Sequence, residues 1–168
     1  MQTSAGSASG FLLDRPSDYR LEDVSISVSF VPPLDEGEIR SFELKGNGNL
    51  RIRDHWRNKD GSEVTLKIKT GIVQRDAVRN VLRTAYRVGF FNMKPELPIG
   101  QQTDIRFKAS NRVEEILVIP PSSSCAVFKI KIEEWDRQVT GCDGSPEDFW
   151  ILVRTLTGLK HYARNTVE

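Results

Sequence analysis

A Gly-Asn-Gly segment at 46–48, flanked by two strand patterns, constrains this 168-residue chain more than any other feature. Asn and Gly accept the positive φ angles of a tight hairpin turn, and Asn-Gly between alternating apolar residues is a strong hairpin signal. We therefore predict antiparallel strands over 38–45 and 50–56. A second turn at 59–61 predicts a returning strand over 63–69. Its alternation points three apolar side chains to the core, namely Val64, Leu66 and Ile68.

Period-two patterns recur on both sides of one helical pattern. Serine alternates with apolar residues over 24–31, which is typical of a half-buried strand. Apolar residues at helical spacing predict a helix over 74–88. Three later segments, 104–109, 113–119 and 125–135, have strand patterns that we interpret as a meander.

The clearest helix start lies near the C-terminal end. Ser145 is a favoured N-cap residue, Pro146 suits the first helical position, and two acidic residues follow next to the positive end of the helix dipole. The apolar residues that follow predict the buried face of this helix: Phe149, Leu152, Val153, Leu156 and Leu159. The fold class that these elements predict is α+β, with an antiparallel sheet of about six or seven strands and two helices packed on one face.

The length predicts a single domain, since domains usually have about 100–200 residues. We expect residues 1–18 to form a flexible leader rich in Ser, Gly and Ala, and residues 19–168 to form the α+β domain. The leader has neither the basic nor the apolar region of a signal peptide. The longest apolar run, 149–153, is far shorter than the roughly 20 residues of a membrane-spanning helix.

Charge is uneven along the chain although the net charge is only +1. Residues 39–131 contain 18 basic and 9 acidic side chains, a net charge of +9, whereas residues 1–38 have −5 and residues 132–168 have −3. This asymmetry predicts either charge pairing within the protein or a basic surface directed at an acidic partner.

Basic residues also follow the periods of the predicted elements. Arginines at a spacing of four line one face of the first helix: Arg75, Arg79, Arg83 and Arg87. Lysines and arginines occupy the predicted outward positions of the strands: Lys45, Arg51, Arg53, Lys67, Lys69, Arg106, Lys108, Lys129 and Lys131. These patterns are typical of solvated surfaces, and they also suit docking to an acidic surface or to the acidic N-terminal segment of the same chain.

Two cysteines, Cys125 and Cys142, leave a disulfide and two free thiols as open alternatives. A bridge would pin the final helix to the sheet and stabilise the fold by roughly 3 kcal/mol on the chain-entropy model. A catalytic thiol is disfavoured, because no histidine lies near either cysteine in the sequence.

Recognisable catalytic and metal-binding motifs are missing from the sequence. The two histidines, His55 and His161, do not form an HExxH motif, and no CxxC, Walker or GxSxG motif occurs. His55 follows Asp54, but neighbouring strand residues point to opposite faces, so we expect His55 to be a surface residue rather than a base. We therefore predict no catalytic residues, no metal site and no cofactor.

One family resemblance rests on the order of the elements. A hairpin with a Gly-Asn-Gly turn precedes a helix, then Val-Gly-Phe-Phe at 88–91 and a strand that begins at Asp104. Over residues 24–119 this order resembles small exported bacterial domains of unknown function. That family often has a cysteine-containing segment after its first strand, where this chain has Pro-Pro-Leu-Asp at 32–35. The resemblance implies an α+β fold and an envelope location, and it implies no catalytic residues.

These observations predict a non-enzymatic interaction domain, such as an inhibitor, immunity or accessory protein of the bacterial envelope, that binds an acidic protein partner. The predicted partner-binding residues are Arg75, Arg79, Arg83, Arg87, Arg51, Arg53, Lys67 and Lys69. A nucleic-acid-binding module is the alternative, and a small hydrolase is the least favoured reading. We expect a periplasmic or secreted location, with a cytoplasmic one as the alternative.

Overall fold

A seven-stranded antiparallel sheet forms the body of the protein in the computed structural model, which describes residues 14–32, 34–97, 102–118 and 124–165. Its strands are β1 (Val24–Val31), β2 (Gly37–Lys45), β3 (Asn49–Arg57), β4 (Glu63–Ile72), β7 (Cys125–Ile132), β8 (Trp135–Cys142) and β9 (Arg164–Asn165). Their order in the sheet is β8-β7-β1-β2-β3-β4-β9. The predicted α+β class is confirmed.

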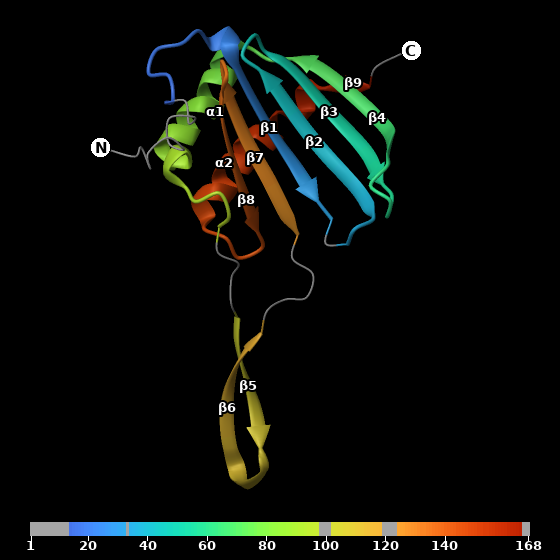
Figure 1. Cartoon of the computed structure of the whole chain (residues 1–168), viewed down its shortest axis with the longest axis vertical. Helices are drawn as coiled ribbons and strands as arrows, with labels where there is room; N and C mark the ends of the chain where they lie inside the picture. Colours follow the sequence, from blue (N-terminus) through green and yellow to red (C-terminus); the bar gives the residue numbers. More distant parts are fainter. Residues whose placement is uncertain (1–13, 33, 98–101, 119–123, 166–168) are drawn as a thin grey trace, which may run out of the picture.

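Two helices, α1 (Arg75–Arg87) and α2 (Glu147–Thr157), lie behind the sheet in Figure 1. We call this face the helix side and the other face the open face. The core lies between the sheet and the helices, and Phe90, Phe128 and Phe149 are fully buried in it. Phe90 and Phe128 pack edge to face with ring centroids 5.4 Å apart. The predicted helical faces are confirmed, because Val78, Val81 and Ala85 of α1 and Phe149, Leu152, Val153 and Leu156 of α2 are buried.

The central hairpin forms as predicted around the Gly-Asn-Gly turn. Leu44 lies opposite Leu50, and Phe42 lies opposite Ile52, so the four side chains share the helix side. Gly48 has a φ angle of 97°, and a Cβ there would lie 2.3 Å from the carbonyl oxygen of Val73. Glycine is therefore required at this position for both its backbone conformation and its small size.

Ser145 lies one residue before the N-cap position of α2, which corrects the prediction. The Ser145 hydroxyl accepts a hydrogen bond from the Cys142 N–H at 2.9 Å, and the Ser145 N–H donates to the Cys142 carbonyl, also at 2.9 Å. These two bonds close a turn between β8 and the helix. Pro146 occupies the N-cap position that the sequence pattern assigned to Ser145.

The segment predicted as one strand over 125–135 is two strands. Glu133 adopts a φ angle of 54°, and the chain turns there from β7 into β8. The sequence of β8 has few strong apolar residues, which is why its pattern did not reveal a strand. Cys142 ends β8 directly opposite Cys125, and their sulfur atoms form a disulfide.

The strands β5 (Gln102–Lys108) and β6 (Arg112–Val118) pair only with each other and form a separate two-stranded sheet. The meander prediction is therefore only partly right, because its first two strands pair as expected but the third, β7, pairs with β1 and β8. Figure 1 shows this hairpin projecting from the lower end of the body. The outer edge of β8 forms hydrogen bonds with the segment that precedes the hairpin. The Leu97 N–H donates to the Thr140 carbonyl, and the Thr140 N–H donates to the Pro95 carbonyl.

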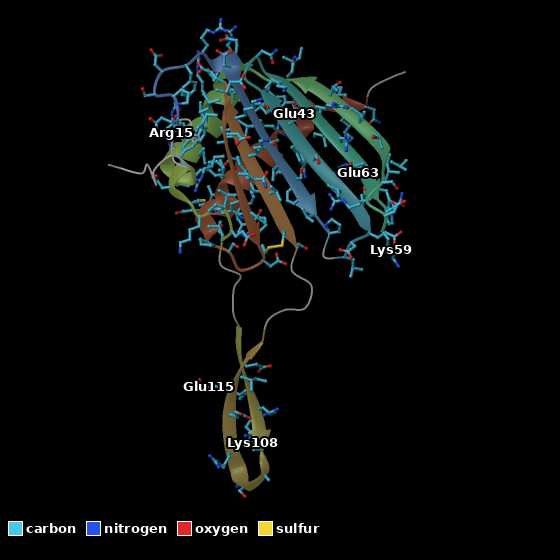
Figure 2. All side chains as sticks on the ribbon, in the orientation of Figure 1. Arg15, Glu43, Lys59, Glu63, Lys108 and Glu115 are labelled. Atoms are coloured by element: carbon cyan, nitrogen blue, oxygen red, sulfur yellow. A yellow bond between two sulfur atoms is a disulfide. The ribbon has the colours of Figure 1, made fainter. Side chains whose placement is uncertain are left out.

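One face of the projecting hairpin contains three apolar residues beside Glu115: Ile105, Phe107 and Val113. Ile105 lies opposite Glu115, and Phe107 lies opposite Val113. Phe107 is 75% exposed, so these apolar side chains do not join the core of the body. Figure 2 shows Lys108 and Glu115 on this hairpin, well below the sheet.

Most of the predicted leader, residues 1–13, lies outside the described residues, so its flexibility stays a prediction. Arg15, labelled in Figure 2, follows this segment closely in the chain. Its guanidinium lies 4.4 Å from the centre of the Phe91 ring. The Tyr19 hydroxyl is 2.7 Å from that of Tyr86 on α1. Among the described residues, neither helix has the length and apolar composition needed to cross a membrane.

Candidate functional site

A groove lies on the helix side of the sheet, next to the C-terminal end of α2. It consists of two adjoining pockets that share Arg40, Phe42 and Lys160. The smaller one, here called the lysine pocket, is lined by Arg40, Phe42, Ile52, Asp54, Lys67, Lys69 and Lys160. The larger one, here called the aromatic pocket, is lined by Phe30, Glu38, Arg40, Phe42, Thr157 and Lys160. Together they form the cationic groove.

Strand register places most of the lysine pocket. On the helix side, one row across β2, β3 and β4 consists of Phe42, Ile52 and Lys69. The next row consists of Arg40, Asp54 and Lys67. Directly opposed residues have Cβ atoms about 4.5–5.5 Å apart, so the two rows form a compact patch. The patch is apolar toward the core and charged toward the lower end of the strands.

Asp54 is the one carboxylate in the lysine pocket, and it already has a partner. The Arg40 Nε donates to its Oδ1 at 2.7 Å, and the Arg40 Nη2 donates to its Oδ2 at 3.0 Å. Asp54 is only 7% exposed. The hydrogen bonds from Arg40 lower the pKa of Asp54 against the opposing effect of burial, and the positive charges of Lys69 and Lys67 lower it further. Asp54 is therefore an ionised, bidentate anchor for Arg40.

Three lysines remain around this anchored pair. Lys67 and Lys69 come from β4, and Lys160 comes from the short helix η5 (Gly158–Tyr162) that follows α2. None of the three forms an ion pair with a residue that the structure describes. The lysine pocket therefore has a surplus of positive charge directed at a space of about 60 Å³.

The aromatic pocket extends the groove away from the lysines. It has a volume of about 500 Å³, and its floor includes Phe30 and Phe42, whose rings pack edge to face with centroids 6.3 Å apart. Glu38 lies on its wall, and its charge adds to the hydrogen bonds with Asp54 that raise the pKa of Arg40. The groove is thus cationic at one end, and apolar with a single carboxylate at the other.

The structure places Lys67 and Lys69 on the helix side, although the sequence pattern predicted that they would face outward with Arg51 and Arg53. The cause is the register with β3, because Lys69 lies opposite the buried Ile52. A β-bulge in the β3–β4 pair also interrupts the alternation. Val64 is 55% exposed and Leu66 is 56% exposed. The prediction that Val64, Leu66 and Ile68 belong to the core was therefore wrong.

Arg51 and Arg53 lie on the open face, away from the groove. Arg51 is opposite Glu43 on β2, and the Arg53 Nη2 is 3.1 Å from the Glu63 Oε2. Figure 2 shows both glutamates, Glu43 and Glu63, beside these strands. Arginine charge on this part of the open face is therefore accompanied by carboxylates.

The other strand cations also divide between different surfaces. On the open face, Lys45 pairs with Glu43 at 2.8 Å, and Lys129 pairs with Asp136 at 3.3 Å. On the projecting hairpin, Arg106 and Lys108 both pair with Glu114. The single basic sheet face predicted from alternation is therefore not formed.

The arginine stripe of α1 is formed as predicted, and all four arginines are exposed. Two of them have partners, since Arg75 lies 3.5 Å from Glu22 and Arg79 lies 2.8 Å from Asp76. In Figure 1, α1 lies at the opposite side of the body from β4. The eight predicted partner-binding residues therefore occupy three separate surfaces: the α1 stripe, the open face and the groove.

His55, expected at the surface, is only 4% exposed. Its Nδ1 accepts a long hydrogen bond of 3.4 Å from the Arg53 Nε, and its Nε2 is 3.4 Å from the Glu63 Oε2. Burial lowers the pKa of His55, and the neighbouring positive charge of Arg53 lowers it further. The bulge beside His55 and the side chains of Arg53 and Glu63 explain why strand alternation did not predict this burial.

Arg40, Asp54 and Lys160 are among the groove residues that sequence reasoning missed. A signal for the first two was present, because both lie at equal distances from the Gly-Asn-Gly turn. Extending the pairing of Leu44 with Leu50 by four residues places Arg40 opposite Asp54 on the core side. Lys160 had no such signal, since its place depends on how α2 packs.

The described residues contain no cluster of three or more side chains suited to hold a metal ion. The chain matches no model of a known protein family, and a search of curated proteins finds no relative.

Proposed function

We propose that this chain is a non-enzymatic interaction domain that binds an acidic group of a protein partner in the cationic groove. The observation that carries the proposal is the lysine pocket. Its carboxylate, Asp54, is already bonded by Arg40, while Lys67, Lys69 and Lys160 have no ion-pair partner among the described residues.

The other basic surfaces support the proposal less well. Several of their cations pair with carboxylates, as Arg75 does with Glu22 and Arg53 does with Glu63. An acidic partner would have to displace those carboxylates to gain a contact. In the lysine pocket, an incoming acidic group relieves repulsion between like charges and displaces nothing that is charged.

An oxidising compartment is part of the proposal. Its support is the disulfide between Cys125 and Cys142, because structural disulfides form and persist mainly in exported proteins. The resemblance to exported bacterial domains points the same way. We therefore propose a periplasmic or secreted location.

The test uses fluorescence anisotropy with a labelled peptide built of Phe-Glu-Glu repeats, and the matching Phe-Gln-Gln peptide as the uncharged probe. The groove variant is Lys67→Gln/Lys69→Gln. The matched control is Lys129→Gln/Lys131→Gln, which removes two lysines at the same spacing from a strand of the open face. We expect the wild type to bind only the acidic peptide, the groove variant to lose at least about tenfold in affinity, and the control to lose less than about twofold.

Equal losses in the two variants would contradict the groove as the binding site. A third variant, Arg79→Gln/Arg83→Gln, tests the α1 stripe, and a loss confined to it would move the contact to that helix. Tighter, salt-dependent binding of a generic single-stranded DNA probe that depends on Lys129 and Lys131 would favour the nucleic-acid alternative.

A further inference from the structure

The two pockets of the groove differ in size and charge, and this difference narrows the chemistry of the ligand. The volume of the lysine pocket is about 60 Å³, which is more than the roughly 10–15 Å³ that one water molecule needs. This volume suits a compact oxyanion but not an oxyanion together with an aromatic ring. The aromatic pocket, at about 500 Å³, has that room. A ligand that fills both therefore has a compact anionic head and a larger body.

The number of lysines indicates the charge of the head. A carboxylate offers one negative charge to the three ammonium groups of Lys67, Lys69 and Lys160. A phosphate monoester has about two negative charges at neutral pH and three strong acceptor oxygens. Lysine ammonium groups bind phosphate as point charges, so three of them around one head match the three acceptor oxygens of the ester.

The aromatic pocket indicates the body of the ligand. Its floor of Phe30 and Phe42 suits a flat apolar group, because aromatic rings pack favourably edge to face or offset. Glu38 on its wall disfavours a second negative charge at that end. The aromatic pocket therefore disfavours a negative charge on the part of the ligand that enters it, and it favours an apolar group there.

We infer that the cationic groove binds a phosphate monoester of an aromatic or similarly flat apolar group, with the phosphate in the lysine pocket and the apolar body against Phe30 and Phe42. This inference rests on the proposed function, since it uses the same groove, and it specifies the acidic group. The ester is a phosphorylated aromatic side chain of the protein partner, and a free small-molecule ester is the other source that the experiment distinguishes.

The experiment is calorimetric titration at low salt and pH 8 with three probes: phenyl phosphate, benzoate and inorganic phosphate. We expect phenyl phosphate to bind at least about tenfold more tightly than either of the other two. Lys67→Gln/Lys69→Gln should lose at least about tenfold in affinity for phenyl phosphate, and Lys129→Gln/Lys131→Gln should lose less than about twofold.

Two further measurements test the orientation of the ligand. The affinity for phenyl phosphate should fall as the pH is lowered through about 6, where the ester takes up a proton, while binding of benzoate stays unchanged there. Glu38→Gln should increase the affinity for 4-carboxyphenyl phosphate several fold more than it increases the affinity for phenyl phosphate. No change with 4-carboxyphenyl phosphate would overturn the placement of the body beside Glu38.

A phosphotyrosine peptide separates the two sources of the ester. Binding at least about tenfold tighter than phenyl phosphate assigns the ester to a phosphorylated partner, and weaker binding assigns it to a free small molecule. If benzoate binds as tightly as phenyl phosphate while the Phe-Glu-Glu peptide still depends on Lys67 and Lys69, the phosphate inference is wrong and the proposed function stands. If both the peptide and phenyl phosphate bind independently of these lysines, both are wrong.

Discussion

The helix side of the sheet has two regions with opposite chemistry on the same pleated surface. Where α1 and α2 cover it, the strand residues are apolar and buried, as with Ile26 of β1 and with Phe128 and Ile130 of β7. Near the end of α2, the same side of β2, β3 and β4 has Arg40, Asp54 and Lys67 instead. Both regions belong to the same antiparallel sheet, and the helical cover differs.

This difference shows that a strand position becomes part of a core only when another element covers it. Lys69 lies opposite Ile52, which is 5% exposed, and the change from core to charged groove takes place between these two neighbours. Substitutions in the two regions should therefore differ in kind: those in the covered region should affect stability, and those in the groove should affect binding.

The largest effect should come from the covered region. Phe128→Ala removes a fully buried ring that packs on Phe90 and leaves a cavity between the sheet and the helices. We expect the free energy of unfolding, measured with urea, to fall by about 3–5 kcal/mol. The control is Phe107→Ala, where the ring is 75% exposed, and its effect should stay within about 0.5 kcal/mol. Similar losses of unfolding free energy in both variants would contradict the conclusion that stability depends on the covered region.

The disulfide should give the next largest effect. It links Cys125 and Cys142, which are 17 residues apart in the sequence and stand on the two strands of the covered region nearest its edge. Cys125→Ala/Cys142→Ala should lower the free energy of unfolding by roughly 3 kcal/mol, since the unfolded chain gains the entropy of an open loop. Unfolding of the wild type in excess reductant should show the same loss. An unchanged stability would mean that the packed layers alone hold these strands.

An intermediate effect is expected at the boundary between the regions. Asp54→Asn removes the charge that Arg40 binds, and the free energy of unfolding at pH 7 should fall by about 1–3 kcal/mol. The folded-state pKa of Asp54 lies below its ordinary value of 3.8, so its contribution is complete above about pH 4 and is lost as the pH falls through the folded-state pKa. Urea titrations at decreasing pH should therefore show wild type and variant converging. A constant difference would exclude the ion pair as the cause.

The smallest effect should come from the lysines of the groove. Lys67→Gln/Lys69→Gln removes two positive charges that have no ion-pair partner among the described residues, so the free energy of unfolding should change by no more than about 0.5 kcal/mol. A small stabilisation at low salt that disappears at high salt would indicate relief of repulsion. A loss above about 1 kcal/mol would show that these lysines support the fold, and the groove would then resemble the covered region.

Much of the covered region could be predicted from local patterns. The Gly-Asn-Gly turn predicted the central hairpin, and helical spacing predicted the buried faces of both helices. The strand β8 could not be predicted, because Val139 is its only strongly apolar aliphatic residue and its pairing depends on β7. The separate β5–β6 hairpin was also unpredictable, since its alternation equals that of a strand in the main sheet.

The groove was harder to predict because it depends on register and on cover. The alternation of β4 has the same form whichever face meets the helices. Only the pairing of Lys69 with Ile52 decides that the lysines of β4 lie on the helix side. Lys67 and Lys69 were identified as binding candidates, but on the wrong surface. Whether they bind a partner stays a prediction.

The projecting hairpin leaves the body and returns to it at almost the same place. Leu97 is bonded to Thr140, and Cys125 is bonded to Cys142, two residues further along β8. The bonds of Leu97 and Cys125 to β8 hold the two ends of this loop together. In general, doubling the length of a loop raises the entropic free energy of closing it by only about 0.6 kcal/mol. The excursion between residues 97 and 125 is therefore a position where chain length can change with little effect on the stability of the sheet, and where foreign segments are best inserted.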